Sequence, residues 1–201
     1  GKTTTIECIL GTRKADAGSV SILGLDSRKE RKQLFEQVGV QFQETGYSDK
    51  IKVWELCEET ACLYRKAANY EDLLRQFDLW EKRGAFVNEL SGGQKQRLFI
   101  VLALLPDPKV VFLDELTTGL DTKARRSVWK SLNTLKQKGL TIFLSSHFMD
   151  EVKVLCDTIA ILKDGNFIFT GTVQEAIHQS PYNNLEEAYL WFTGEEETDD
   201  E

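Results

Sequence analysis

The sequence predicts an α/β fold with a mainly parallel sheet. The main observation is a set of three apolar runs that polar residues follow at once: 110–113, 140–144 and 158–162. Runs that are apolar on both faces are typical of parallel strands, which helices cover on both sides. We therefore expect three buried strands. Asp164-Gly165 is a hairpin-turn signal after the third run, and it leads into the apolar residues 167–169.

The stretch between the first two runs predicts a helix that connects them. Residues 122–138 form a 17-residue segment whose start Asp121 can cap and whose end Gly139 can close. The apolar residues at helical spacing are Ala124, Val128, Leu132 and Leu135. A strand, a helical crossover and a second strand make a βαβ unit, from which parallel sheets are built.

The remaining segments predict elements around this unit. Residues 2–10 have the pattern of a helix that Gly11 closes, and residues 20–23 that of a short strand. Between residues 44 and 90 no strand pattern is convincing, whereas two apolar faces recur at helical spacing. We therefore predict a mostly helical insertion in an α/β core.

Composition excludes several classes of protein. The chain has 201 residues and a formal net charge of −7, which argues against a partner bound mainly through nucleic-acid phosphates. Its longest apolar run, 98–105, has eight residues, far below the ~20 that a membrane-spanning helix needs. The four cysteines follow no metal-binding spacing, and we predict small, buried, reduced core residues. The mostly acidic residues 195–201 predict a solvated end.

Three short motifs point to phosphate chemistry. Gly1-Lys2-Thr3 before a helix matches the last positions of a phosphate-binding loop. Backbone N–H groups at a helix N-terminus favour anions, a lysine can reach the β- and γ-phosphates, and a threonine hydroxyl can bind Mg²⁺. By itself this tripeptide is weak evidence, because such tripeptides occur by chance.

The second motif is Asp114-Glu115, at the carboxyl end of the predicted strand 110–113. Parallel sheets bind ligands at this edge, where one carboxylate can orient Mg²⁺ and another can activate water. A turn or helix cap after a strand explains the pair equally well.

The third motif, Leu90 to Gln94, opens a helix with a serine and two glycines. Such a start offers N–H groups, a hydroxyl and close backbone approach, which suit an anion. Taken alone, these residues do not exclude an ordinary helix start, with a serine N-cap and a glycine-rich turn.

Together these motifs resemble those of the nucleotide-binding subunit of an ABC transporter. Residues 90–94 match the family's signature motif letter for letter, residues 1–4 resemble the end of Walker A, and residues 110–115 resemble Walker B with its catalytic glutamate. Further matches are Gly119–Asp121 to the D-loop, His147 to the switch histidine and Gln43 to the Q-loop glutamine. Motif order and spacing fit across essentially the whole chain.

The resemblance implies a P-loop NTPase (RecA-like) core with an inserted α-helical subdomain. Residues 1–43 and 98–178 would form the core, 44–97 the helical signature subdomain, and 179–201 a C-terminal helix and acidic tail. It also implies that the chain begins within Walker A, and we expect such a chain to bind ATP poorly on its own.

The resemblance further implies a role for each motif residue, with ATP and Mg²⁺ as cofactors. The residues implied to take part in catalysis are Glu115, His147 and Gln43. The residues implied to bind nucleotide are Gly1, Lys2, Thr3, Thr4, Ser91, Gly92, Gly93, Gln94 and Asp121. The residues implied to hold Mg²⁺ are Thr3, Gln43 and Asp114.

The implied partners are a second nucleotide-binding domain, which completes an ATP sandwich, and an integral-membrane permease, which inserts a short helix near residues 44–54. The place of action would be cytoplasmic, peripheral at the inner face of the membrane. Residues 117–121, 145–147 and 185–190 look like the exporter branch related to drug and antibiotic efflux.

Two alternatives stay open. A soluble ATPase of the same superfamily that acts on nucleic acid or the ribosome is disfavoured, because only 88 residues without sustained heptads separate Lys2 from Ser91. The second alternative, a regulatory fragment that does not hydrolyse ATP, stays open because Leu116 stands where the family has a proline after the catalytic glutamate. Losing that proline frees a backbone torsion, and we expect a modest loosening of the loop that holds Glu115.

Overall fold

The computed structural model describes residues 1–41, 47–48 and 50–195. The chain divides into two compact units. Gly1–Thr5 with Ser146–Glu201 form the terminal unit, and Ile6–Ser145 form the central unit. The domain boundaries inferred from the resemblance remain a prediction.

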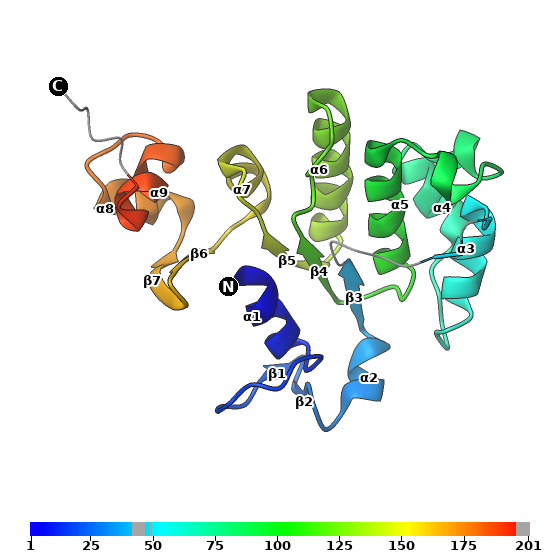
Figure 1. The fold of residues 1–201 in the computed structure, drawn as a ribbon, viewed down its shortest axis with the longest axis horizontal. Helices are drawn as coiled ribbons and strands as arrows, with labels where there is room; N and C mark the ends of the chain where they lie inside the picture. The colour runs from blue at the N-terminus through cyan, green and yellow to red at the C-terminus, as the bar shows by residue number, and fades with distance from the viewer. Residues whose placement is uncertain (42–46, 49, 196–201) are drawn as a thin grey trace. The chain divides into compact units, whose positions relative to one another are not determined.

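A three-stranded parallel sheet organises the central unit (Figure 1). Its strands lie in the order β3 (Val38–Gln41), β4 (Val110–Asp114) and β5 (Thr141–Ser145). The register places Gln41 beside Leu113 and Asp114 beside Ser145. The carboxyl ends of all three strands therefore share one edge. The sequence predicts β4 and β5 but not β3, and the third predicted strand, 158–162, pairs in a separate antiparallel hairpin instead.

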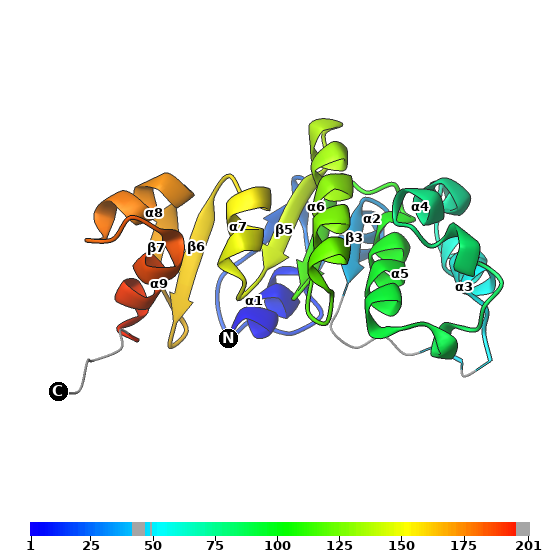
Figure 2. The same ribbon diagram turned by 90° about the horizontal axis from the view of Figure 1, so that it is seen from above.

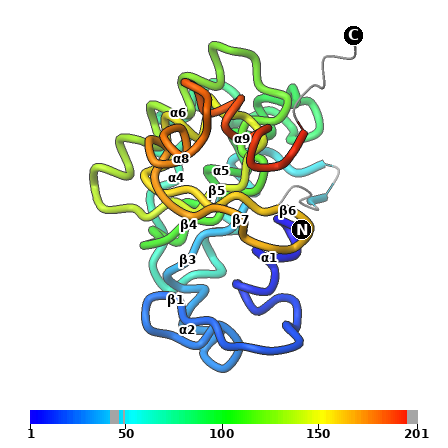
Figure 3. The backbone as a smooth tube through the Cα atoms, turned by 90° about the vertical axis from the view of Figure 1, so that its left-hand side faces the viewer, coloured from blue at the N-terminus to red at the C-terminus, as the bar shows by residue number. Residues whose placement is uncertain are grey.

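Helices cover the two faces of this sheet (Figures 1 and 3). On one face α5 (Gly92–Leu104) and α6 (Thr122–Gln137) run next to each other, as the view from above also shows (Figure 2). On the other face lie the end of α1 (Lys2–Ile9), the hairpin β1 (Ser21–Ile22) and β2 (Leu25–Asp26), and α2 (Arg31–Phe35). A core cluster fills this second face: Ile6, Leu10, Ile22, Leu34, Val38, Val110 and Phe112.

Strands β4 and β5 differ in burial, although the sequence predicts that both are covered on both faces. The central strand β4 is buried at all five positions, as expected. The prediction is wrong for β5, where Phe143 is 40% exposed. Its ring contacts Phe112 at 5.0 Å between centroids. However, β5 is an edge strand, and unlike β3, the other edge strand, it contributes no residue to the cluster on this face.

The predicted helix ends of the core are confirmed. The Asp121 carboxylate accepts a hydrogen bond from the Ala124 N–H at 2.8 Å and so caps α6. After this helix Gly139 adopts a positive φ of 100°, and after α1 Gly11 adopts one of 68°. Glycine enters this left-handed region readily, so it stops a helix at little cost.

The predicted helical insertion is confirmed within the part of it that the structure describes. It contains α3 (Val53–Ala61), α4 (Tyr70–Gln76) and the 3₁₀ turns η1 (Trp80–Lys82) and η2 (Val87–Glu89). We call residues 50–90 the helical segment. Its buried side chains come from the predicted apolar faces and include Val53, Leu56, Leu73, Leu74 and Phe77.

All four cysteines are free thiols. Cys57 on α3 is buried, whereas Cys8 and Cys156 are half-buried. The prediction of buried cysteines is wrong for Cys62, which is exposed because it caps the C-terminal end of α3, past the buried stripe of that helix.

In the terminal unit, α7 (Met149–Leu155) precedes the hairpin β6 (Ile159–Lys163) and β7 (Asn166–Gly171), which α8 (Val173–Gln179) and α9 (Leu185–Thr193) follow. The predicted turn is confirmed, because Asp164 and Gly165 both have positive φ, as a tight hairpin requires. The expectation that 158–162 is covered on both faces is wrong, since β6 exposes Ala160 and buries Ile161. Only the face with the cluster Ile161, Phe169, Ala176 and Leu185 is packed.

No helix within the described residues is long and apolar enough to cross a membrane. The acidic residues 196–201 lie outside the described part of the chain.

Candidate nucleotide-binding site

A buried carboxylate ends the central strand. Asp114 is the last residue of β4 and is only 2% exposed. Its partner in the register is Ser145, the last residue of β5, whose hydroxyl donates a hydrogen bond to an Asp114 carboxylate oxygen. Since a buried charge is costly without partners, this hydrogen bond helps hold Asp114 at the carboxyl edge of the sheet. The predicted metal-binding carboxylate therefore lies where parallel sheets bind ligands.

Glu115 follows in a backbone conformation that is rare for its residue type. Its φ is +52°, a left-handed conformation that costs of order 1 kcal/mol. The Glu115 N–H donates to the Ser145 carbonyl oxygen at 3.1 Å, and its own carbonyl accepts from the Thr118 N–H at 3.3 Å. These two bonds fix the backbone of Glu115, and its side chain is half-buried.

The loop after Glu115 is anchored on both sides. The Leu116 side chain is completely buried. From α5, the Gln96 side-chain amide donates to the Leu116 carbonyl oxygen at 2.8 Å and lies 3.5 Å from that of Glu115. Leu116, which replaces the family's proline, therefore adds a core contact to this loop. The expected loosening of the loop remains a prediction that only activity can test.

The signature residues form the N-terminus of α5. The Ser91 hydroxyl accepts from the Gln94 N–H at 3.3 Å, and the Gln94 side chain accepts from the Ser91 N–H at 2.9 Å. This reciprocal capping box fixes the start of the helix. Ser91 and Gly92 are exposed, and the first N–H groups of a helix have no partner within it. Exposed donors at the start of a 13-residue helix suit an anion.

The signature packs against the predicted D-loop. A methyl group on Gly93 would stand 3.1 Å from the Leu120 side chain, so a larger residue would require Leu120 to shift by a few tenths of an ångström. The loop continues through Gly119, with a φ of +78°, to Asp121. The observed contact of Asp121 is the cap of α6, and its predicted role at the nucleotide stays a prediction.

The other residues predicted to bind phosphate, Gly1 to Thr4 and His147, belong to the terminal unit. Gly1 to Thr4 are exposed at the N-terminus of α1. The Lys2 ammonium lies 3.4 Å from the carbonyl oxygen of Ser146, next to His147. The exposed His147 ring stacks on Phe148, with 4.1 Å between centroids. Lys2, one predicted γ-phosphate ligand, thus contacts the residue before His147, the other predicted ligand.

One predicted site residue cannot be placed. Gln43, expected both in catalysis and at the metal, lies outside the described residues. Among the described residues, no group of three or more His, Cys, Asp or Glu side chains is arranged to hold a metal ion.

Two positioning residues were missed by sequence reasoning. Ser145 directly follows the predicted strand 140–144, and this position at the carboxyl end of a strand was the available signal. Gln96 stands five residues after Ser91 in a helix start rich in polar residues, so nothing local distinguishes it from a solvent-facing side chain. Its contact with Leu116 joins segments 20 residues apart.

Comparison with known proteins agrees with this geometry. The profile of the ABC transporter family matches residues 1–118. The Nod factor export ATP-binding protein I of Burkholderia lata is 36% identical over 85% of this chain and 58% of its own length. ABC transporter A family member 9 of Dictyostelium discoideum is 32% identical over 94% of this chain and 24% of its own length. The chain thus spans just over half the length of the export proteins that it matches.

Solved structures show the same fold. The structure of an ATP-binding subunit of an ABC transporter superposes with a TM-score of 0.86, at 28% identity, over 96% of this chain and 83% of that one. A dimeric ATP-binding cassette in a post-hydrolysis state, bound to ADP and Pi, has a TM-score of 0.76 at 25% identity, over 86% and 80% of the two chains.

This α/β fold with its acidic strand end and its signature helix defines an ATP-binding cassette. The chain belongs to the ABC transporter family, and the predicted P-loop NTPase fold with a helical insertion is confirmed.

Proposed function

We propose that this chain binds and hydrolyses ATP as the energising part of an ABC-type exporter, whose substrate passes through a separate integral-membrane permease. The observation that carries the proposal is the anchored pair at the end of β4. There Asp114 is buried against Ser145, and Glu115 is held by Ser145 and the Gln96 loop contact. The names of the export relatives support the direction of transport.

Phosphoryl transfer requires mainly positioning and charge stabilisation. We assign Glu115 to orient or deprotonate the attacking water, and His147 and Lys2 to contact the γ-phosphate. The N-terminal N–H groups of α1, within Gly1 to Thr4, would bind phosphate oxygens. Gln43 would sense the attacking water.

Mg²⁺ suits the oxygen donors available here. The Thr3 hydroxyl, the Asp114 carboxylate and the Gln43 side-chain carbonyl would hold it, and when bound it neutralises charge on the phosphates. The burial of Asp114 and its bond from Ser145 support this role, because they keep the carboxylate fixed at the edge of the sheet.

We further propose that two such domains close on ATP. The signature of one domain, Ser91 to Gln94, would cover the phosphates held by the other, with Asp121 at the contact between them. Exposure of Ser91 and Gly92 at a capped helix start supports this. The dimeric cassette bound to ADP and Pi is a precedent within the fold. The place of action would be the cytoplasmic face of the membrane, beside the permease.

The test compares the whole protein with its Glu115→Gln variant. The variant should lose at least about 100-fold in ATP turnover, the range expected for a lost catalytic base, and should elute as a dimer in ATP on size exclusion. Glu59→Gln, an exposed change on α3, is the matched control and should behave like the parent. A Glu115→Gln protein that hydrolyses ATP at the parent rate would refute the assignment.

A further inference from the structure

The C-terminal end of α4 joins three helices of the central unit. We call the residues that make these contacts the helical junction: Gln76, Phe77, Asp78, Arg97, Ser127 and Ser131. The Gln76 side-chain amide donates to the Ser131 carbonyl oxygen at 3.3 Å, and the Ser131 hydroxyl donates back to the Gln76 carbonyl oxygen at 3.0 Å. This reciprocal pair fastens the end of α4 to α6.

A single carboxylate oxygen of Asp78 connects two further helices. Its Oδ2 atom accepts a hydrogen bond from the Ser127 hydroxyl, on α6, at 2.8 Å. The same oxygen lies 3.7 Å from the Nη1 atom of Arg97, on α5. That nitrogen also donates to the Phe77 carbonyl oxygen at 3.3 Å. Asp78 therefore links the signature helix α5 to α6 through the end of α4.

The backbone of Asp78 has a conformation that favours glycine. Its φ is +56°, which glycine adopts freely and aspartate only at a cost. The side chain is 62% exposed, and exposed ion pairs contribute little to stability. Strained residues are concentrated at positions with a functional use. The use that the structure offers for Asp78 is the connection that its carboxylate makes.

Arg97 depends on this carboxylate. Its side chain is 16% exposed, and its Nε atom is buried without a hydrogen-bond partner among the described residues. Within the same residues, Asp78 is its only ion-pair partner. A largely buried charge is costly unless it is paired. Without the carboxylate, Arg97 would keep the Phe77 carbonyl as its acceptor and would lose its link to α6.

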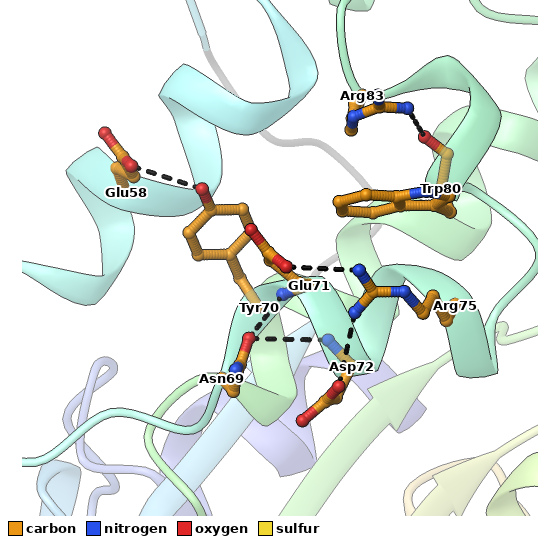
Figure 4. Close-up of polar contacts among 8 residues, drawn as sticks. All are labelled: Glu58, Asn69, Tyr70, Glu71, Asp72, Arg75, Trp80 and Arg83. Atoms are coloured by element: carbon orange, nitrogen blue, oxygen red, sulfur yellow. Dashed lines mark hydrogen bonds and ion pairs between the residues drawn. The ribbon is translucent and has the colours of Figure 1, made fainter.

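Helix α4 reaches the junction as a braced element (Figure 4). The Asn69 side chain caps its start by accepting from two N–H groups of the first turn, at 2.8 and 3.4 Å. Further along, Arg75 pairs with Glu71 at 3.1 Å, and its guanidinium lies 3.9 Å from the centroid of the Trp80 ring, in η1. Asp78 is therefore held by structure on both sides of it in the chain.

The junction lies at the same depth along the two helices that begin at predicted site residues. Arg97 comes six residues after Ser91, the N-cap of α5, and Ser127 comes six residues after Asp121, the N-cap of α6. Six helical residues span about 9 Å. The helices run next to each other (Figure 2), and their starts meet where the signature packs on the D-loop. Contacts at two levels fix the direction of one helix relative to the other.

We infer that Asp78 is a positioning residue for the closure of two domains on ATP. The inference rests on the proposed function, in which Ser91 to Gln94 and Asp121 of one domain meet the other. By holding both helices through one carboxylate, Asp78 keeps these two contact regions in one arrangement before the domains meet. Preorganised contacts avoid the cost of ordering on association. Asp78 acts through Arg97 and Ser127 and touches no reacting atom.

Glycine at position 78 separates this role from a purely structural one. Asp78→Gly removes the carboxylate and also the cost of the positive φ, so the urea midpoint of the whole protein should stay near that of the parent. Asp107→Gly is the matched control. Asp107 also has a positive φ, of +51°, is 63% exposed and pairs with Lys66 at 3.7 Å, but it has no contact with the junction.

The readout is the ATP-dependent dimer of the whole protein in the Glu115→Gln background, measured by sedimentation. Asp78→Gly should raise the dissociation constant of the dimer at least ~5-fold and leave the ATP affinity of the monomer unchanged. Asp107→Gly should match the parent. Adding Ser127→Ala to Asp78→Gly should weaken the dimer no further, because both changes remove one shared hydrogen bond. A dimer as tight as that of the control would overturn the inference, and so would a loss that follows a lowered urea midpoint.

Hydrogen exchange distinguishes failure of the inference from failure of the proposed function. If Glu115→Gln forms no dimer in ATP, the proposed closure is contradicted, and the monomer decides on the junction. There Asp78→Gly should speed exchange of the Gln94 and Ala124 N–H groups, at the starts of α5 and α6, at least ~5-fold over Asp107→Gly. Unchanged exchange at both amides would overturn the positioning role.

Discussion

Replacing Gly39 by alanine should destabilise the central unit, because a methyl group has no room there. Gly39 lies in β3, where this strand packs on α5. A Cβ atom at this position would stand 1.8 Å from the backbone carbonyl oxygen of Ala103 and 3.2 Å from Pro108. Since backbone occupies the space, no side-chain rotation relieves the clash, and α5 would have to retreat by about 1 Å or more.

The size of this effect follows from the packing. Overpacking in a core typically costs about 1–3 kcal/mol, and more when backbone must move. We therefore expect Gly39→Ala to lower the free energy of unfolding by at least about 3 kcal/mol. For a domain of this size that corresponds to a fall in Tm of about 6–12 °C. Because α5 carries Ser91 at its start, ATP turnover should fall as well.

Urea unfolding followed by circular dichroism is the assay, with Gly84→Ala as its matched control. A Cβ atom on Gly84 would meet nothing within 4 Å, so this change should alter stability by less than about 0.5 kcal/mol. If Gly39→Ala unfolds at the parent's urea midpoint, the close packing of β3 on α5 is wrong.

Four further predictions concern the site and the thiols. Leu116→Ala should lower the free energy of unfolding, measured in urea, by about 2–5 kcal/mol, because the Leu116 side chain is completely buried. A decrease below about 1 kcal/mol would contradict the role of Leu116 as an anchor. Gln96→Leu should lower the kcat for ATP about tenfold with little change in KM, since it removes the hydrogen bond to the Glu115 loop; a KM effect alone would show that Gln96 acts in binding. Ellman's reagent should label exposed Cys62 in the native protein and spare Cys57, whose pKa burial raises from 9.0 to about 12. Native labelling of both thiols would refute the burial of Cys57 in α3. Because only the unfolded state releases the Cys57 proton between pH 9 and 12, the free energy of unfolding should also fall as the pH rises through that range.

Most of the local structure could be predicted from the sequence. The hairpin turn at Asp164-Gly165 and the caps at Ser91 and Asp121 each depend on neighbours within a few residues, so their signals are complete in the sequence. Apolar periodicity likewise located β4 and α6. The candidate site followed from motif residues at strand and helix ends, where Asp114 and Ser91 are indeed found.

The sequence by itself determined the motifs and the strongly periodic elements such as β4 and α6, but it did not indicate α2, β3 or α8. Only the tertiary structure decided that β5 is an edge strand with an exposed Phe143, and that Ser145 and Gln96 hold the Asp114–Glu115 pair. Likewise, only folding brings Trp54 of α3, Tyr70 of α4 and Trp80 of η1 together to line one cavity. The reason is physical: caps and turns are satisfied within a few residues, whereas burial and long-range hydrogen bonds depend on which segments the folded chain places together.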